Sequence, residues 1–527
     1  MPAPFIPLRG FAPDLDPTQP GVIVDCQFLL PTVKGMKAAA QPIASTYAPL
    51  PAKTNGAATV VLLNGTTRAF AGMAVAIYEA VGGTWKDVTR GAAPGTELAA
   101  GDPLNAHMGK PEATPEQAQE RDADGDLKAV VPYRGTDDNT WRFSQLGNAT
   151  LAVNGADPIQ QSITAGPFAD IAGAPVAKCI DVAAGFVMVA NTSDATYGER
   201  PDAWWCSALY NQANWVPDIG TQCATARLVD TPGANTACRA LGSNFVIYKD
   251  ASMFYGTYQN APVIWAWNCV SNNVGAPSQE AVINIGTAHV FLGNDNFYFF
   301  DGTRPTPIGD EVKEWFFGQR LPSAMYRMRS MHDQRNSLVY WFFVSTNSTD
   351  GVTLDRGLVY NYRAKKWGRA DYKLESVFEE VIGQITWDSL GSKYATWDDL
   401  PKVAYNSPFW VQSSRVPAII DTAHKLHTLT GKATVSGFAT GEIGDDEAYT
   451  DLQYVRLRCL NDPDTGRMGG LHRYTLGTDD FETSETAYVD GKFDVDVSAR
   501  WHALAFAFTG DVEITGYAPT AVKDGEQ

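Results

Sequence analysis

A short unit of sequence recurs along the middle of this chain and restricts its possible folds more than any other property. In each unit a glycine or asparagine precedes a short apolar strand, and a tight turn leads to the next strand. The markers Gly147, Gly185, Gly242 and Gly286 are separated by 38, 57 and 44 residues, and Asn336 follows after a further 50. Repeats of about 40–50 residues with three or four short strands each are the signature of β-propeller blades.

A propeller also explains the recurrence physically. One small sheet has two apolar faces and cannot bury both alone, whereas sheets stacked around a ring cover one another and leave no exposed end. An earlier unit at residues 58–79, around Asn64-Gly65, and a later one at residues 405–430 extend the repeat. We therefore predict an all-β fold with a β-propeller of about six to seven blades. Two or three stacked sandwiches are the alternative all-β arrangement.

The stretches around the repeat differ from it in composition. Residues 1–51 are rich in proline and have little periodicity, so we expect an N-terminal arm that lies over the surface. Residues 52–432 form the predicted propeller, with residues 91–139 as a loop inserted into it. Alternating runs in residues 433–527 predict a C-terminal β-sandwich-like domain, which ends in a hairpin through Thr509-Gly510-Asp511. Helical periodicity is confined to residues 115–122 and 310–317.

The charge balance limits what the chain can bind. It has 41 basic and 59 acidic residues, which give a formal net charge of −18. Affinity for nucleic acid comes largely from basic side chains that neutralise phosphates, so this chain is not expected to grip DNA. No apolar run approaches the ~18 residues that a membrane helix needs, and no membrane span is predicted.

The seven cysteines indicate no covalent framework. Their number is odd and no C-x-x-C pair occurs, so we predict neither disulfides nor a zinc site. We expect reduced thiols that are buried as small apolar side chains, in keeping with synthesis in the cytosol.

The histidines and acidic residues do not predict a metal site. His424 and His427 are three positions apart, which places them on opposite faces of a strand. The acidic run at residues 122–126 is similar to the start of a calcium loop. However, Leu127 and Tyr133 stand where that loop needs Gly and Glu.

One turn is similar to a motif of propeller enzymes. Gly82-Gly83-Thr84-Trp85 resembles the end of the Asp-box turn of sialidase-type propellers, yet Ala80 stands where the Asp belongs. A glycoside hydrolase would also need a pair of carboxylates or a tyrosine nucleophile, and no pattern singles one out. No catalytic, cofactor-binding or metal-binding residue is assigned, and we predict that the chain is not an enzyme.

Two groups of side chains are candidates for contact with a partner. Aromatic pairs can stack on a ligand, but in alternating strands they more often fill the space between blades, and we favour this second role. Basic residues are concentrated between 304 and 373, where a contact with DNA or an acidic neighbour is first expected, although solvated or ion-paired side chains are more common. The aromatic group comprises Trp204, Trp205, Trp265, Trp267, Trp315, Phe316 and Phe317, and the basic group comprises Arg304, Arg327, Arg329, Arg335, Arg356, Arg363 and Arg369.

Four runs of sequence resemble those of a known group of proteins. They are Pro13-Asp14-Leu15-Asp16-Pro17-Thr18 with the nearby Pro20-Gly21-Val22, residues 64–68 (NGTTR), residues 298–305 (YFFDGTRP) and residues 359–367 (VYNYRAKKW). Together with the layout of arm, propeller and terminal sheet domain, these runs resemble the tail hub, or packaged-DNA-stabilisation, proteins of short-tailed bacteriophages. The resemblance covers most of the chain in layout and is diffuse residue by residue. The insertion at residues 91–139 departs from the pattern of that family.

The resemblance implies a structural role in a virion tail. Such proteins form a homo-hexameric ring, or nozzle, below the portal and the head–tail adaptor, carry fibres or spikes, and meet a plug or needle protein at the DNA exit. Genomic DNA would pass through the lumen without sequence-specific binding, and an acidic wall would let it slide. A receptor-binding or carbohydrate-binding propeller of the tail is the alternative, and a propeller glycoside hydrolase is a third possibility.

Overall fold

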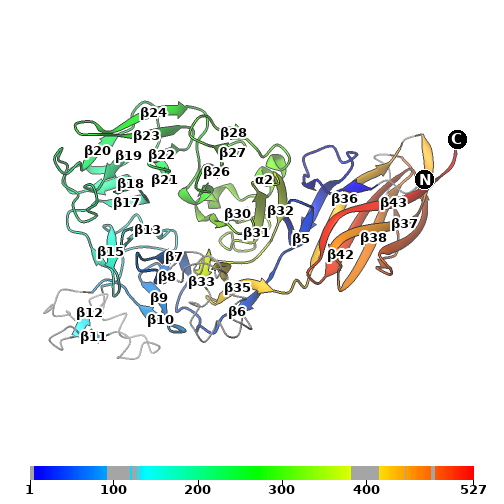
Figure 1. Cartoon of the computed structure of the whole chain (residues 1–527), viewed down its shortest axis with the longest axis horizontal. Helices are drawn as coiled ribbons and strands as arrows, with labels where there is room; N and C mark the ends of the chain where they lie inside the picture. Colours follow the sequence, from blue (N-terminus) through cyan, green and yellow to red (C-terminus); the bar gives the residue numbers. More distant parts are fainter. Residues whose placement is uncertain are drawn as a thin grey trace, which may run out of the picture.

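The structure, a computed structural model, describes residues 5–91, 119–121, 127–129, 131–381, 415–445, 447–475 and 481–526. It has two parts that lie next to each other: a ring of small sheets and a narrower body of long strands, which holds both ends of the chain (Figure 1). Within the described ranges, no helix has the length and apolar character that a membrane crossing needs.

The ring is a β-propeller, as the repeat predicted. Six separate four-stranded sheets and the first four strands of a ten-stranded sheet take seven positions around it, in agreement with the predicted six to seven blades. The innermost strands contact one another in order, and the last contacts the first, which closes the ring. The blades are, in order, β7 to β10 (Thr54–Val61, Thr67–Met73, Ile77–Val81, Thr84–Asp87), β13 to β16 (Arg142–Leu146, Ala149–Val153, Gln160–Ile163, Ala169–Asp170), β17 to β20 (Val176–Ala183, Phe186–Asp194, Gly198–Cys206, Ala224–Arg227), β21 to β24 (Asn235–Leu241, Asn244–Lys249, Met253–Asn260, Ile264–Ser271), β25 to β28 (Val282–Asn284, His289–Leu292, Phe297–Phe300, Thr306–Pro307), β29 to β32 (Arg329–Asp333, Leu338–Phe343, Arg356–Asn361, Lys366–Arg369), and β33, β34, β35 and β6 (Ser376–Val381, Arg415–Ile420, Leu426–Gly431, Gln41–Ala44).

The glycine markers of the repeat occupy one place in consecutive blades. Gly147, Gly185, Gly242 and Gly286 lie in the turn between the first and second strands of blades 2 to 5, with φ between +61° and +93°. Glycine enters this left-handed region without the steric cost that a side chain would bring. The predicted repeat is therefore confirmed as a recurring turn.

The second part is a sandwich of two sheets, in agreement with the predicted sandwich-like domain. One sheet has the order β2-β3-β36-β42-β38, and β39 and β40 both pair with β38. The other is the far half of the ten-stranded sheet, β4-β5-β43-β37-β41, and β1 pairs with β43. The strands are β1 (Ile6–Pro7), β2 (Gly10–Phe11), β3 (Val22–Gln27), β4 (Leu29–Pro31), β5 (Met36–Ala38), β36 (Ser436–Gly444), β37 (Ala448–Asn461), β38 (Thr465–Arg473), β39 (Phe481–Glu482), β40 (Thr486–Ala487), β41 (Lys492–Ala499), β42 (Trp501–Thr509) and β43 (Glu513–Glu526).

The N-terminal stretch is part of the core, so the expected surface arm in residues 1–51 is wrong for the residues that the structure describes. Phe11, Ile23, Leu29 and Met36 are fully buried in the main hydrophobic cluster. Strands β1 to β5 complete the sandwich, and β6 pairs with β35 as the outer strand of the last blade. Pro7 in β1 and Pro42 in β6 lie in strands at sheet edges, which tolerate proline, and Pro31 is the last residue of β4.

The predicted C-terminal hairpin is also wrong. Strand β42 pairs with β36 and β38, whereas β43 pairs with β37, β5 and β1 in the opposite sheet. The turn Thr509-Gly510-Asp511 therefore crosses from one sheet of the sandwich to the other. Both strands gain long partners in this way, which a local hairpin would not supply.

The expected helices and the insertion are only partly visible. Strand β11 (Gln119–Arg121) pairs with β12 (Leu127–Ala129), so residues 119–121 of the expected helix 115–122 are strand, and its other residues lie outside the described ranges. The second expected helix is present as α2 (Lys313–Gln319). Two 3-10 helices, η1 (Gln279–Ala281) and η2 (Pro322–Arg327), lie in connections between blades.

One hydrophobic cluster joins the propeller to the sandwich. It includes Val290 and Trp341 from blades 5 and 6 together with Phe438 and Phe506 from the sandwich. The ten-stranded sheet runs through the same region from blade 6 to β41. The two parts are thus connected by shared core and by backbone pairing, not by a linker alone.

Candidate functional site

A buried ion pair lies at the centre of the propeller. Arg142, at the start of the innermost strand of blade 2, donates from Nε and Nη2 to the two carboxylate oxygens of Glu280, each at 2.7 Å. Glu280 belongs to η1, which connects blades 4 and 5. The pair therefore joins blades from opposite sides of the ring, with side-chain exposures of 14% and 11%.

Neighbouring groups extend this network. Gln279 exchanges hydrogen bonds with the backbone of Ile180 in blade 3, and Arg239 of blade 4 donates to the Gln279 carbonyl. Burial by itself would raise the pKa of Glu280, but the charge of Arg142 outweighs it and the pKa lies below its usual value. Side chains thus occupy the centre of the ring at the level of η1.

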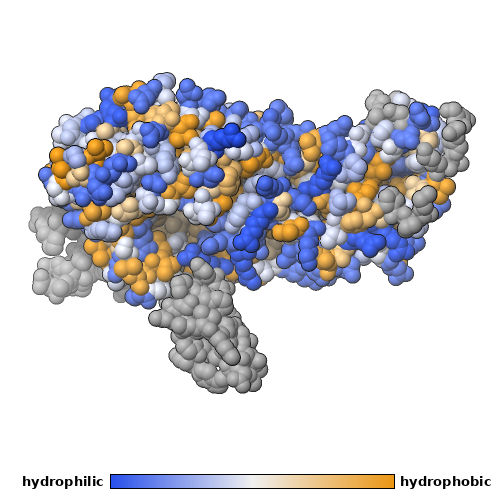
Figure 2. Space-filling model, turned by 45° about the horizontal axis from the view of Figure 1, so that its top comes forward, coloured by the Kyte–Doolittle hydropathy of each residue, from blue (hydrophilic) through white to orange (hydrophobic). Residues whose placement is uncertain are grey.

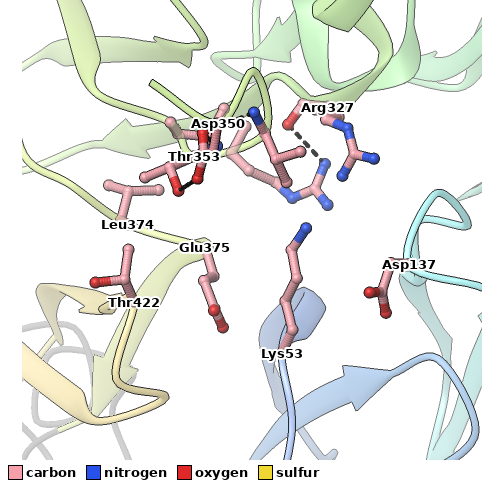
Figure 3. Close-up of a pocket in the computed structure, with 11 residues that line it drawn as sticks. Lys53, Asp137, Arg327, Asp350, Thr353, Leu374, Glu375 and Thr422 are labelled. Atoms are coloured by element: carbon pink, nitrogen blue, oxygen red, sulfur yellow. Dashed lines mark hydrogen bonds between the residues drawn. The ribbon is translucent and has the colours of Figure 1, made fainter. Parts of the chain in front are cut away.

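A pocket of about 320 Å³ opens where blades 6, 7, 1 and 2 meet at one face of the ring. Several of its charged lining residues come from the connections that lead into innermost strands: Lys53 precedes β7, Asp137 precedes β13, and Glu375 precedes β33. Figure 3 shows Lys53 rising into the middle of the pocket between Glu375 and Asp137, with Arg327 beyond its tip. The other lining residues are Arg329, Asp350, Val352, Thr353, Leu354, Leu374 and Thr422.

The three cations of the pocket differ in their partners. Arg327 forms an ion pair with Asp138, which is itself exposed. Arg329 donates only to uncharged acceptors, among them the carbonyls of Asn55 and Met328, each at 3.0 Å. Lys53 Nζ has no hydrogen bond or ion pair with any residue that the structure describes.

Two of the acidic groups are held by their own surroundings. Asp350 accepts hydrogen bonds from the Val352 and Thr353 amides and from the Thr353 hydroxyl, which lower its pKa. Glu375 accepts from the Thr54 amide at 2.9 Å and lies 3.0 Å from His424 Nδ1. Asp137 is exposed and faces the pocket (Figure 3). The arrangement suits the binding of a charged group.

The aromatic residues of blades 3 and 4 behave as predicted, whereas Trp315 packs on Phe11 of the sandwich, with ring centroids 5.0 Å apart. Trp204, Trp265 and Phe316 are almost fully buried, and the ring centroids of Trp204 and Trp267 lie 5.4 Å apart. Trp204 belongs to blade 3 and Trp267 to blade 4, so this contact fills the space between blades. Their role is packing, and they do not form an exposed ligand platform.

The two histidines that are close in sequence contact different acidic side chains. His424 contacts Glu375, and His427 Nε2 lies 2.8 Å from Asp421. No group of three or more potential metal ligands occurs among the described residues. Residues 122–126, the run similar to a calcium loop, lie outside them.

The seven arginines named in the stretch 304–373 are divided among three environments. Arg327 and Arg329 line the pocket. Arg356 and Arg369 both pair with Asp371 at the junction with the sandwich. The remaining three, Arg304, Arg335 and Arg363, are exposed in turns of blades 5 and 6.

Sequence analysis missed Lys53, Asp137, Asp350 and Glu375. The sequence could have indicated two of them, because Lys53 and Glu375 directly precede innermost strands, and such connections converge on one face of a propeller.

The cysteines agree more closely with the prediction of reduced, buried thiols. All seven cysteines are unpaired and five are buried, while Cys269 is exposed.

No protein-family model and no curated protein matches the chain. Among solved structures, it is similar to a chain of the mitotic checkpoint complex (7% identity, TM-score 0.36, covering 74% of this chain and 94% of that one). It is also similar to the Pan2 WD40 domain of Neurospora crassa (7%, 0.34, 71% and 94%) and to the computationally designed Ika8 protein (9%, 0.33, 73% and 99%). These likenesses concern the fold alone.

Proposed function

We propose that the chain is a structural tail hub, or nozzle, protein of a short-tailed bacteriophage. Copies of it would form a ring that extends the DNA exit channel below the head–tail adaptor, retains packaged DNA and anchors fibres or spikes. The proposal starts from the resemblance of four sequence runs and of the layout to that family. The virion tail is then its place of function.

The observation that carries this proposal is the continuous connection between propeller and sandwich. A wall element of a tail must transmit force without bending between its parts. Here the ten-stranded sheet and the shared hydrophobic cluster join the two parts. Interiors packed in this way have low compressibility and transmit strain.

The proposed conduit lies between copies and not through a single propeller. Side chains of Arg142, Gln279 and Glu280 occupy the centre of one ring. The DNA path would therefore be the axis around which six protomers assemble. A predominantly acidic wall on that axis would repel phosphates, and residues 433–527 carry 18 acidic against 7 basic side chains.

Imaging of labelled virions tests the proposal. The protein, carrying a compact tag after its last residue, would be incorporated into particles and located by electron microscopy. A ring of label on the distal tail axis is the expected result. Label on peripheral appendages, or none on the virion, would refute the hub.

A second candidate, a receptor-binding propeller, is favoured by one loop of blade 3. Tyr210, Val216 and Ile219 are 76%, 68% and 59% exposed between β19 and β20, while Trp215 anchors the loop from within. A rigid loop with an exposed ring can stack on a sugar. Glycan-array binding that is lost in Tyr210→Ala would support this candidate over the hub.

A further inference from the structure

Two cations in the pocket between blades 6, 7, 1 and 2 form no ion pair with a described residue. Among the described residues, neither Lys53 nor Arg329 has a carboxylate within ion-pair distance. Arg329 donates from Nη1 and Nη2 to the Thr140 hydroxyl and to backbone carbonyls, which do not neutralise its charge, and its buried Nε has no partner among the described residues. Arg327, the third cation, pairs with Asp138 outside the pocket lining.

The surroundings of these cations disfavour their charge. Burial lowers the pKa of Lys53 and the neighbouring charge of Arg327 lowers it further, and the more distant carboxylates of Asp137 and Glu375 offset this only in part. Burial also lowers the pKa of Arg329 to about 10, far below that of a solvated guanidinium. Taking charges out of water without a partner is costly, so an anion placed among them would recover part of that cost.

The acidic groups of the pocket do not supply this anion. The Asp350 carboxylate accepts hydrogen bonds within the turn at residues 350–353. Glu375 accepts a hydrogen bond from the Thr54 amide and contacts His424. Asp137 faces Lys53 across the opening but lies beyond ion-pair distance and is solvated (Figure 3). The space at the tip of Lys53 is therefore open to an external group.

We propose that this pocket binds an oxyanion of the phosphate class, with Lys53, Arg327 and Arg329 as its positive wall. A phosphate group has three or four oxygens and about two negative charges, which match several donors that approach from different directions. A single carboxylate pairs best with one guanidinium and would leave the other cations uncompensated. The ammonium of Lys53 supplies free donors, whereas Arg327 and Arg329 contribute mainly positive charge, because most of their donors are already engaged by Asp138, Tyr326 and backbone carbonyls.

The same phosphate chemistry has two possible sources, the free ion and a nucleic-acid backbone. The formal charge of −18 opposes the approach of a polyanion, which favours the small ion. The site does not depend on the proposed tail function, and the test below can fail while the hub proposal stands.

Calorimetric titration of the full chain with sodium phosphate, at constant ionic strength set by sodium chloride, tests the site. We expect saturable binding that is weakened at least about tenfold in Lys53→Met, because one of three cations is lost. The matched control is Lys373→Met, which removes an exposed positive charge near the same face but outside the lining. Unchanged melting temperatures would show that both variants fold.

A second variant should change the affinity for phosphate in the opposite direction. Asp137→Asn removes the exposed negative charge that faces the pocket, so phosphate should bind a few times more tightly. A site for a cation would instead be weakened by this substitution.

A short single-stranded DNA separates the two sources. Binding of phosphate alone assigns the free ion, and binding of the oligonucleotide that is lost in Lys53→Met assigns the backbone. No binding of either at millimolar concentration, or equal binding by wild type and Lys53→Met, would overturn the proposal.

Discussion

The Arg142–Glu280 pair is the residue-scale feature whose removal should cost most. Both carboxylate oxygens of Glu280 are engaged, and both side chains are largely buried. Arg142→Met would leave Glu280 charged and unpaired at the centre of the ring. We expect a loss of about 3–5 kcal/mol in the free energy of unfolding, measured by chemical denaturation.

The double variant Arg142→Met/Glu280→Gln is the control for this prediction. It removes both charges, so the uncompensated carboxylate that makes the single variant unstable is absent. We expect it to be clearly more stable than Arg142→Met alone. Additive losses would mean that the two side chains act independently and that the centre is not joined by this pair.

A pair of buried histidines should make the sandwich sensitive to acid. His472 Nδ1 lies 2.8 Å from His502 Nδ1, and the outer nitrogens contact Thr483 and Thr450. Burial lowers the pKa of both, that of His472 to about 4. The unfolded chain therefore takes up protons first, near pH 6.5, and stability is lost as the pH falls from there toward 4.

The size of this loss of stability follows from the shift in the pKa of His472. For His472, the change from 6.5 to about 4 corresponds to at most on the order of 3 kcal/mol. Denaturation midpoints measured between pH 7 and 4.5 should fall in the wild type and fall less steeply in His472→Gln/His502→Gln. Parallel slopes would contradict a role for the pair.

At the scale of elements, the sequence predicted those strands whose partners are close along the chain. The markers at Gly147, Gly185, Gly242 and Gly286 identified blades because each blade is built from consecutive hairpins. The N-terminal strands were not predictable in this way. Strand β3 pairs with β36 about 400 residues later, and no local pattern specifies such a partner.

The pocket residues show the same limit of prediction from local sequence. Arg327 and Arg329 were predicted as candidates because they lie in the basic stretch 304–373, whereas no motif or charge cluster surrounds Lys53 or Asp137 in the sequence. They meet only because ring closure brings blades 1 and 2 next to blades 6 and 7. Composition could thus indicate part of the positive wall but not the pocket itself.

The docking of the N-terminal segment can be tested at one glycine. A Cβ at Gly441 in β36 would lie 1.9 Å from the Pro17 carbonyl oxygen, whose backbone cannot move aside easily. Gly441→Ala should destabilise the sandwich by roughly 1–3 kcal/mol. Gly469→Ala in β38 is the matched control, because nothing lies within 4 Å of its Cβ. Equal melting temperatures for the two variants would argue against tight docking of residues near Pro17.

At the scale of the whole molecule, the path of the chain makes the propeller and the sandwich depend on each other. The N-terminal strands enter the sandwich, β6 closes the propeller, and the chain returns to the sandwich only after β35. Each part therefore depends on a segment far away in sequence. Such interdependence would oppose separation of the two parts under load, which the proposed tail function requires.

This interdependence predicts one unfolding transition for propeller and sandwich together. Scanning calorimetry should show a single peak, because separating the two parts would expose Trp341, Phe438 and the other members of their common cluster. A fragment of residues 433–527 should not fold alone, since it lacks β3, the partner of β36, as well as β5 and β1 on β43. Adding a peptide of residues 5–44 should restore dispersed amide signals in NMR spectra. Two separate peaks, or a folded spectrum from the fragment without the peptide, would show that the sandwich is an independent domain.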